Sequence, residues 1–206
     1  MGPHSPRLCV TESHSPLAPP MPAEIAALRD GGEPVWIFAY GSLLWDARLR
    51  DAPTEAALLR GYHRSFCLYS YDYRGTPARP GLTLGLDSGG SCRGAALRLP
   101  TDALDRVWHR EMSGRLVYAA RLLLVYTAKG ARQALAFTAL RSCADYVGRL
   151  PLDQKARMIL GAAGRHGACR DYFENTLRHL EQLGFADAPL RRLAERVQAL
   201  AAGDRV

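Results

Sequence analysis

The sequence predicts an α+β protein, built as a small and mainly antiparallel β-barrel with helices around it. Segments with strand composition are concentrated between residues 35 and 140, whereas helical spacing of apolar residues dominates from residue 152 onward. This segregation is typical of an antiparallel sheet with helices packed against it. Because the chain has 206 residues and is 48% hydrophobic, it can bury one sizeable core. We expect a single domain over residues 22–206.

The first expected strand is the continuous apolar run VWIFAY at residues 35–40, which fits a strand buried on both faces. The second, residues 57–70, mixes aromatic residues with Gly61, as a strand containing a bulge does. Two later runs of strand composition are residues 121–126 and 134–140.

Residues 82–86 and 93–99 flank the turn-forming tract DSGG at residues 87–90, which predicts a β-hairpin. A helix is expected next, over residues 101–111, with its apolar residues on one side. The region after residue 152 is expected to be helical, because apolar residues recur there at three- and four-residue intervals. The clearest example is the series Leu190, Leu193, Val197 and Leu200.

Residues 1–21 are rich in proline and serine and lack the apolar stretch of a secretory signal. We expect them to form a flexible lead, since such a composition buries too little apolar surface to become ordered. No window holds about 18 uninterrupted apolar residues, so we expect no membrane partner. The five cysteines lack metal-binding spacing. A cytoplasmic protein with reduced thiols is the simplest interpretation.

The net charge of +7 comes from arginines spread along the chain, and only two of the 27 basic residues are lysines. Aromatic residues are not interleaved with these arginines, as they are in proteins that bind single-stranded nucleic acids. We therefore expect no nucleic-acid partner and interpret most of the arginines as solvated.

The turn after the first strand is the first candidate for a site. Tyr40 ends the apolar run, and Gly41 and Ser42 interrupt it before the apolar character resumes at Leu43. A glycine directly after a buried strand permits a tight turn. Successive N–H groups in such a turn can form an anion-binding nest. The alternative is a simple strand exit covered by a hydrophobic loop.

Three further side chains are candidates. Glu111 ends the amphipathic helix, although a lone glutamate there is more often an ordinary surface residue. For Tyr118 the alternative interpretation is an ordinary strand residue whose hydroxyl is in water. Tyr172 and Asn175 share one face of a helix, which also fits a half-buried structural helix.

Other chemistries lack their motifs. The histidines share no metal-binding spacing, so we expect no metal. Ser42 lies outside a G-x-S-x-G nucleophile elbow, because the tract reads AYGSL. The turn does not open a G-x-G-x-x-G or Walker loop either, so no nucleotide site is indicated.

Several motifs occur together in a fixed order, namely VWIFAYGSLLW (35–45), LLRGYHRSFCLYSYDYRGTPARPGLTLGLDSGGSCRGAALRL (58–99), REM (110–112) and GACRDYFENTLRHLEQLGF (167–185). With these motifs the sequence resembles the ChaC-like γ-glutamylcyclotransferases over about 150 residues, from Trp36 to Phe185. The resemblance implies a small β-barrel with helices packed around it. It also implies conversion of glutathione to 5-oxoproline and cysteinylglycine, with no metal or organic cofactor.

The resemblance further implies roles for individual residues. The loop of residues 40–43 would hold the γ-glutamyl moiety, and Glu111 would be the general acid/base. Tyr118 would help to shape the pocket, and Tyr172 would face it from the late helix.

The chemistry of these residues agrees with the implied reaction, in which the substrate's α-amine attacks its own γ-carbonyl carbon. That amine has a reference pKa near ~8, so a base must take a proton before the attack. Partial desolvation of Glu111 would raise its pKa, as this role requires. Backbone N–H groups of Gly41, Ser42 and Leu43 would bind either the α-carboxylate or the developing oxyanion.

The identity of the leaving group is less constrained. Arg74 and Arg79 lie in the RGTP-x-x-PG loop and either meet the glycine carboxylate of glutathione or are solvated. Related cyclotransferases act on other γ-glutamyl compounds. A non-catalytic module that binds γ-glutamyl groups or peptides on the same scaffold is the remaining alternative. Nothing in the sequence indicates the oligomeric state.

Overall fold

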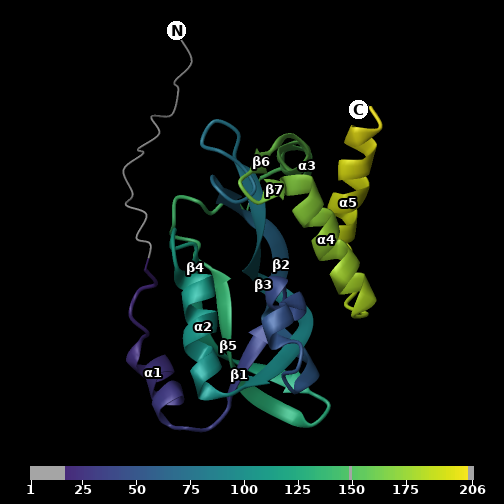
Figure 1. Ribbon diagram of the computed structural model, residues 1–206. Helices are drawn as coiled ribbons and strands as arrows, with labels where there is room; N and C mark the ends of the chain where they lie inside the picture. The colour runs from purple at the N-terminus through teal and green to yellow at the C-terminus, as the bar shows by residue number, and fades with distance from the viewer. Residues whose placement is uncertain (1–16, 149, 204–206) are drawn as a thin grey trace.

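In the computed structural model, which describes residues 17–148 and 150–203, the main strands close into a barrel in the order β1-β3-β2-β4-β5 (Figure 1). Neighbouring strands are antiparallel, except that β1 and β5 pair in parallel at Ile37 and Leu135 and thereby close the barrel. The predicted fold class is confirmed. The barrel strands are β1 (Val35–Ala39), β2 (Thr54–Ser70), β3 (Gly81–Leu99), β4 (Tyr118–Thr127) and β5 (Gly130–Ala139).

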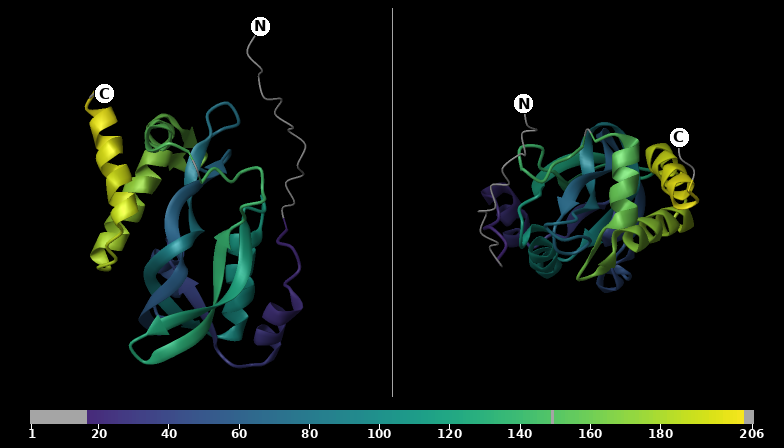
Figure 2. Two further views of the ribbon diagram at one scale, coloured as in Figure 1. Left: turned by 180° about the vertical axis from the view of Figure 1, so that it is seen from behind. Right: turned by 90° about the horizontal axis from the view of Figure 1, so that it is seen from above.

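Two groups of helices cover the barrel on opposite sides (Figure 2). Helices α1 and α2 lie on one side, and α3, α4 and α5 lie on the other. No helix in the described part of the chain is long and apolar enough to cross a membrane. The helices are α1 (Ala23–Asp30), α2 (Thr101–Met112), α3 (Leu152–Gly161), α4 (Cys169–Gln182) and α5 (Ala188–Ala201). Short elements are the 3-10 helices η1 (Ser42–Trp45) and η2 (Ala47–Leu49) and the strands β6 (Ala163–Gly164) and β7 (Gly167–Ala168).

Strand β1 is buried on both faces, as its continuous apolar run predicts. Ile37 and Ala39 belong to the core shared with α1 and α2, whereas Phe38 and Tyr40 belong to the core shared with α3, α4 and α5. Successive side chains of a strand point to opposite faces. Strand β1 therefore connects the two halves of the core, and its C-terminal end is held from both sides.

The predicted hairpin at residues 87–90 is wrong, because residues 81–99 form one continuous strand that pairs with β2 on both sides of this tract. Gly89 and Gly90 have φ angles of 104° and 72°, and Gly61 has a φ of 83° at the facing irregularity in β2. Glycine adopts such angles without steric cost. The tract therefore bends two paired strands together instead of reversing the chain, and the expected bulge in β2 is its counterpart.

The packed part of the chain extends upstream of residue 22, the predicted first residue of the domain. Residues 1–16 of the expected lead lie outside the described residues. Ala18 and Met21 pack against the core shared with α1 and α2, and the Trp108 Nε1–H donates a hydrogen bond of 2.7 Å to the Pro19 carbonyl. The packed part of the chain therefore begins before residue 22.

Candidate active site

The chain turns tightly where β1 ends. A Cβ atom added at Gly41 would lie 3.0 Å from Leu84 Cδ2, so glycine leaves room for the Leu84 side chain beside the turn. The 3-10 helix η1 begins at the next residue, and the Leu44 N–H donates to the Gly41 carbonyl at 2.8 Å. The interruption in the apolar run is therefore a compact turn between a buried strand and a single helical turn.

The apolar residues after this turn fix it to the rest of the protein. Leu43 is buried in the core shared with α2. The Trp45 ring stacks on the His179 ring of α4, with 4.6 Å between centroids and 20° between planes. The turn is thus held by helices from both sides of the barrel, which accounts for apolar residues where a polar turn would be ordinary.

A buried arginine secures the same turn from inside. Arg64 on β2 is 1% exposed, and its Nε–H donates to the Tyr40 carbonyl at 2.5 Å. Its Nη2–H donates to the Arg93 carbonyl, and its Nη1 lies 3.5 Å from Asp187 Oδ2. Asp187 also accepts the Leu190 N–H at the start of α5. One guanidinium therefore links the end of β1 to β3 and to α5.

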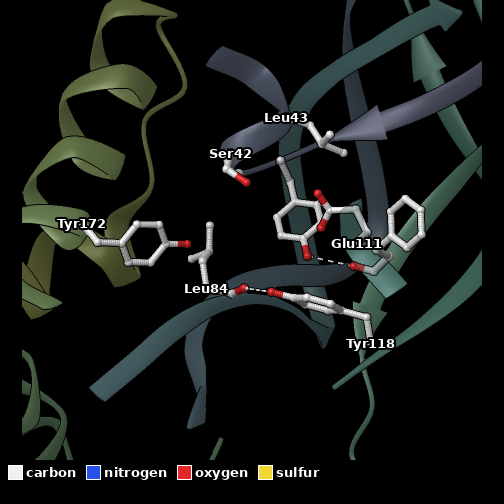
Figure 3. A pocket seen from close by; sticks show the side chains of 9 residues that line it. Ser42, Leu43, Leu84, Glu111, Tyr118 and Tyr172 are labelled. Atoms are coloured by element: carbon white, nitrogen blue, oxygen red, sulfur yellow. Dashed lines mark hydrogen bonds between the residues drawn. The ribbon is translucent and has the colours of Figure 1, made fainter. Parts of the chain in front are cut away.

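A pocket opens beside the turn and encloses about 330 Å³, part of it open to solvent (Figure 3). Strands, turn and helices from both sides of the barrel contribute to its wall. The lining residues are Tyr40, Gly41, Ser42, Leu43, Leu84, Glu111, Tyr118, Phe137 and Tyr172.

Glu111 points into this pocket from the last turn of α2 (Figure 3). Its side chain is 15% exposed. Burial raises the pKa of the Glu111 carboxyl, and the nearby Asp46 raises it further, while the Arg110 guanidinium partly offsets both effects. A carboxyl group in such a surrounding exchanges protons closer to neutral pH than an exposed one.

Three tyrosine side chains surround Glu111. The Tyr40 hydroxyl donates to the Phe137 carbonyl at 2.8 Å, and the Tyr118 hydroxyl donates to the Leu84 carbonyl at 2.9 Å. Burial raises the pKa of Tyr172 to about 12, and raises the pKa values of Tyr40 and Tyr118 well above their ordinary value. These hydroxyls therefore stay neutral near physiological pH and act through hydrogen bonds rather than as bases.

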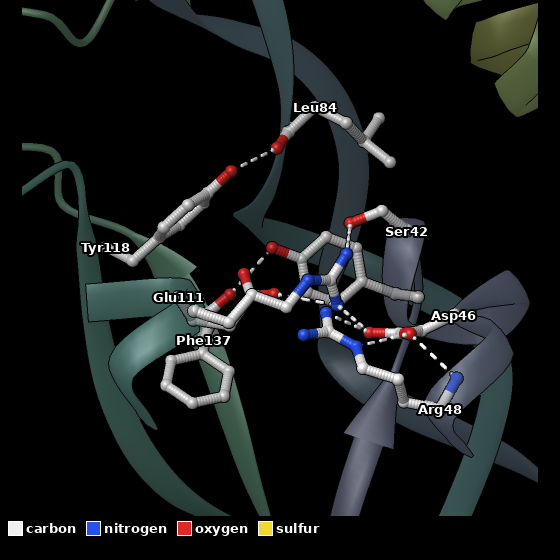
Figure 4. Close-up of polar contacts among 9 residues, drawn as sticks. Ser42, Asp46, Arg48, Leu84, Glu111, Tyr118 and Phe137 are labelled. Atoms are coloured by element: carbon white, nitrogen blue, oxygen red, sulfur yellow. Dashed lines mark hydrogen bonds and ion pairs between the residues drawn. The ribbon is translucent and has the colours of Figure 1, made fainter. Parts of the chain in front are cut away.

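Arg110 precedes Glu111 on α2 and connects this helix to Ser42 and Asp46. Ser42, Asp46 and Glu111 lie close together in Figure 4. Arg110 donates its Nη2–H to Ser42 Oγ at 2.8 Å, and its Nη1 lies 3.4 Å from Asp46 Oδ2 and 3.2 Å from Glu111 Oε1. Asp46 in turn accepts from the backbone and the guanidinium of Arg48. The hydrogen bonds from Arg48 keep the pKa of Asp46 below its ordinary value, so this carboxylate stays charged.

Arg74 does not line the pocket, unlike the other predicted site residues. Its guanidinium lies over the Tyr172 ring, 4.9 Å from the ring centroid, and its Nη1–H donates to the His166 carbonyl. Arg74 therefore contacts a residue that lines the pocket without lining it itself. This arrangement fits contact with a part of a ligand that extends past Tyr172, but not with the part enclosed beside Glu111.

The structure brings the remaining predicted residues together, namely Tyr40, Gly41, Ser42, Leu43, Glu111, Tyr118 and Tyr172. Sequence reasoning missed Leu84, Phe137 and the link from Arg110 to Ser42. Leu84 and Phe137 are apolar strand residues with no distinguishing pattern. The position of Arg110 next to Glu111 was the one available signal for its proximity to the site.

The other chemistries considered find no support in the site. The Ser42 hydroxyl contacts an arginine rather than a histidine that could activate it. Among residues 17–148 and 150–203, no group of His, Cys, Asp and Glu side chains is arranged to hold a metal ion.

Comparison with known proteins defines the class to which this fold and site belong. A family model described as ChaC-like protein matches residues 35–200, and the chain belongs to this family. Gamma-glutamylcyclotransferase 2-3 of Arabidopsis thaliana is 31% identical over 176 residues, which cover 80% of this chain and 88% of the relative.

Two further comparisons agree. The glutathione-specific gamma-glutamylcyclotransferase of Escherichia coli is 33% identical over 184 residues, which cover 87% of this chain and 79% of the relative. The crystal structure of a yeast gamma-glutamyl cyclotransferase specific to glutathione superposes with a TM-score of 0.71 at 18% identity, covering 82% of this chain and 99% of the yeast chain. At that identity the superposition supports the fold.

Proposed function

We propose that the protein is a γ-glutamylcyclotransferase that converts glutathione to 5-oxoproline and cysteinylglycine. The observation that carries this proposal is Glu111, which supplies the only carboxylate among the described residues that line the pocket. Its burial beside the turn of residues 40–43 matches a site for one acid/base group and one γ-glutamyl moiety. The Escherichia coli relative, named as glutathione-specific, supports glutathione as the substrate.

In the proposed reaction, ionised Glu111 takes a proton from the substrate's α-ammonium group. The free amine attacks the γ-carbonyl carbon and forms the carbon–nitrogen bond of a five-membered lactam. Glu111 then gives this proton to the cysteine nitrogen as the γ-glutamyl carbon–nitrogen bond breaks. The attacking nitrogen loses its second proton to the freed carboxylate, which passes it to the released amine of cysteinylglycine. The products are 5-oxoproline and cysteinylglycine, and the carboxylate is regenerated. The reacting amine and carbonyl belong to one molecule, so the pocket has only to fold the substrate and relay protons from the attacking nitrogen to the leaving nitrogen.

The tyrosine hydroxyls suit the amine end of the substrate. Those of Tyr40 and Tyr118 already donate their hydrogens to backbone carbonyls. Their oxygens therefore remain available as acceptors for the N–H groups of the α-amine. The backbone N–H groups of Gly41, Ser42 and Leu43 would bind either the α-carboxylate or the oxyanion that develops on the γ-carbonyl.

The pH dependence follows from the environment of Glu111. Burial raises the pKa of its carboxyl above 4.5, and the base must be ionised to act. We expect kcat/KM for glutathione to fall as the pH is lowered through this raised pKa, while activity is retained above it. The measurement is a pH–rate profile with the fold monitored by circular dichroism. Full kcat/KM at pH 4.5 in folded protein would contradict Glu111 as a buried base.

Arg74 is proposed to bind the glycine carboxylate of the leaving group. Its guanidinium is already ordered over Tyr172 and by the His166 carbonyl, so little freedom is lost when a carboxylate binds. A charged hydrogen bond of this kind corresponds to a selectivity of about tenfold or more.

We therefore expect Arg74→Met to lower kcat/KM for glutathione about tenfold and to leave the glycine ethyl ester of glutathione nearly unaffected. Arg79→Met is the matched control, because Arg79 lies in the same loop and is exposed. Steady-state kinetics on both substrates distinguishes the two positions. An equal loss of kcat/KM for glutathione and for its glycine ethyl ester would show that Arg74 only supports Tyr172.

The activity is tested by incubating the purified protein with glutathione and quantifying 5-oxoproline and cysteinylglycine by chromatography. The proposal expects equal amounts of both products. Calorimetric binding of glutathione without turnover would favour the non-catalytic binding module. Turnover of γ-glutamyl dipeptides in preference to glutathione would favour a cyclotransferase for other γ-glutamyl compounds.

Cytoplasmic location is part of this proposal. Cys67, Cys92, Cys143 and Cys169 are free thiols. Burial raises the pKa of Cys67 and of Cys92 to about 12, which keeps both as unreactive thiols. A reducing compartment rich in glutathione fits these features.

A further inference from the structure

Arg110 occupies a position that the reaction described so far does not use. Its guanidinium contacts two segments of the site at once, through Ser42 Oγ and Asp46 on the turn and through Glu111 on α2. The Nη1 atom is buried and, within the described part of the chain, completes no hydrogen bond of good geometry, although two carboxylates lie within 3.4 Å. A buried donor without a hydrogen-bond partner is rare in native proteins, so its position calls for a physical explanation.

The contact with Ser42 determines what that hydroxyl can offer to a ligand. Ser42 Oγ accepts the Arg110 Nη2–H at 2.8 Å, so its own hydrogen is left to donate elsewhere. Ser42 lines the pocket. A hydroxyl that accepts from a cation is a stronger donor to an anion, because linked hydrogen bonds polarise one another. The Ser42 hydroxyl is therefore available as a hydrogen-bond donor to a ligand in the pocket, at the wall formed by residues 40–43.

The contact with Glu111 supplies the cation that opposes the effect of burial. The ionisable groups facing Glu111 are Asp46 from the turn, Tyr40 after β1, Tyr118 on β4, Tyr172 on α4 and its own neighbour Arg110. The tyrosines are neutral, and Asp46 is already paired with Arg48. Arg110 is therefore the cation that favours the ionised form of Glu111.

We propose that Arg110 is a positioning residue of the cyclotransferase reaction. One guanidinium holds the Glu111 carboxylate in its basic form and makes Ser42 a hydrogen-bond donor to the α-carboxylate of the γ-glutamyl group. Because the guanidinium contacts both Glu111 on α2 and Ser42 on the turn, it also fixes the position of the base relative to the bound substrate. This inference rests on the proposed function and assigns the substrate oxygen that Ser42 binds.

The test compares Arg110→Met, Arg110→Lys and the control Arg106→Met. Arg106 lies one turn earlier on α2, is 63% exposed and pairs with Asp102 at the surface. The first readout is the carbon-13 titration of the Glu111 carboxyl in ligand-free protein, assigned with Glu111→Gln. The second readout is kcat and KM, determined separately across a range of pH.

In Arg110→Met we expect the Glu111 titration and the acidic limb of kcat/KM to move together to higher pH. We also expect a loss of about 10²-fold in kcat/KM at neutral pH. Arg110→Lys should keep the titration near its original position but raise KM, because lysine restores the charge without the fork that reaches Ser42. Adding Ser42→Ala to Arg110→Met should raise KM no further, since the two residues act as one unit. Arg106→Met should match the original protein.

An unchanged Glu111 titration in folded Arg110→Met, with activity lost equally at all pH values, would overturn the inference. Additive effects of Ser42→Ala and Arg110→Met on KM would overturn the Ser42 part. If Arg110→Met does not fold, Arg110→Gln takes its place in both measurements, and an unchanged KM in Arg110→Lys would still overturn the Ser42 part. Absence of glutathione turnover in the original protein would instead refute the proposed function, so the two failures are distinguishable.

Discussion

Glu111→Gln is expected to lower kcat for 5-oxoproline formation by about 10³-fold while glutathione still binds. Glutamine has the shape of the carboxylate but cannot take a proton from the α-amine or deliver one to the cysteine nitrogen. The variant should be at least as stable as the original, because it removes a charge whose burial is unfavourable. Chromatography of 5-oxoproline measures kcat, calorimetry measures the affinity for glutathione, and thermal unfolding measures the stability.

The matched control for this prediction is Glu174→Gln. Glu174 is an exposed glutamate on α4, where it pairs with Arg170 at 2.7 Å. We expect full activity in this variant, because its carboxylate lies on the surface and lines no part of the pocket. Unchanged turnover in Glu111→Gln would remove Glu111 from the mechanism.

Arg64→Met is expected to lower the free energy of unfolding by about 3–5 kcal/mol, as removal of one partner of a buried ion pair typically does. The change leaves the Asp187 carboxylate, which is 12% exposed, without its cation, and two backbone carbonyls without their donor. Methionine fills most of the space, so the loss reflects unsatisfied polar groups rather than a cavity. Urea unfolding, followed by circular dichroism, measures the difference.

Arg60→Met is the control, since Arg60 lies on the same strand but is exposed over the Tyr126 ring, 5.2 Å from its centroid. Its loss should cost about 1 kcal/mol or less. Because Arg64 also holds the Tyr40 carbonyl, we expect Arg64→Met to turn over glutathione more slowly even where it is fully folded. Equal unfolding free energies for Arg64→Met and the original protein would show that the guanidinium is not needed to secure the turn.

The features that the sequence predicted correctly depend on local patterns. The continuous apolar run of residues 35–40 indicated a strand buried on both faces, and the structure has β1 between the two halves of the core. The apolar character that resumes after Gly41 and Ser42 has its explanation in the packing of Leu43 against the α2 side and of Trp45 against α4.

The features that the sequence did not predict depend on contacts between distant segments. The DSGG tract has the composition of a hairpin turn, but β2 is long enough to pair along both sides of it, and this pairing keeps the chain running as one strand. The same limit applies to Arg64 and Arg110. Neither residue type nor spacing reveals that one reaches the Tyr40 carbonyl and the other reaches Ser42.

Arg74 illustrates an intermediate case. Its loop was recognisable in the sequence, but its direction was not. The structure places the guanidinium over the Tyr172 ring and against the His166 carbonyl, outside the set of residues that line the pocket. Sequence therefore located the residue near the site but could not tell which part of a substrate it would meet.

Intramolecular attack by the α-amine is the central claim, and the mass of the γ-glutamyl product formed from glutathione in oxygen-18 water tests it most directly. Cyclisation keeps the original γ-carbonyl oxygen and adds none from solvent. We therefore predict 5-oxoproline without oxygen-18, released in equal amount with cysteinylglycine and absent with Glu111→Gln. Glutamate carrying one oxygen-18 atom would instead show attack by water, and would contradict the account.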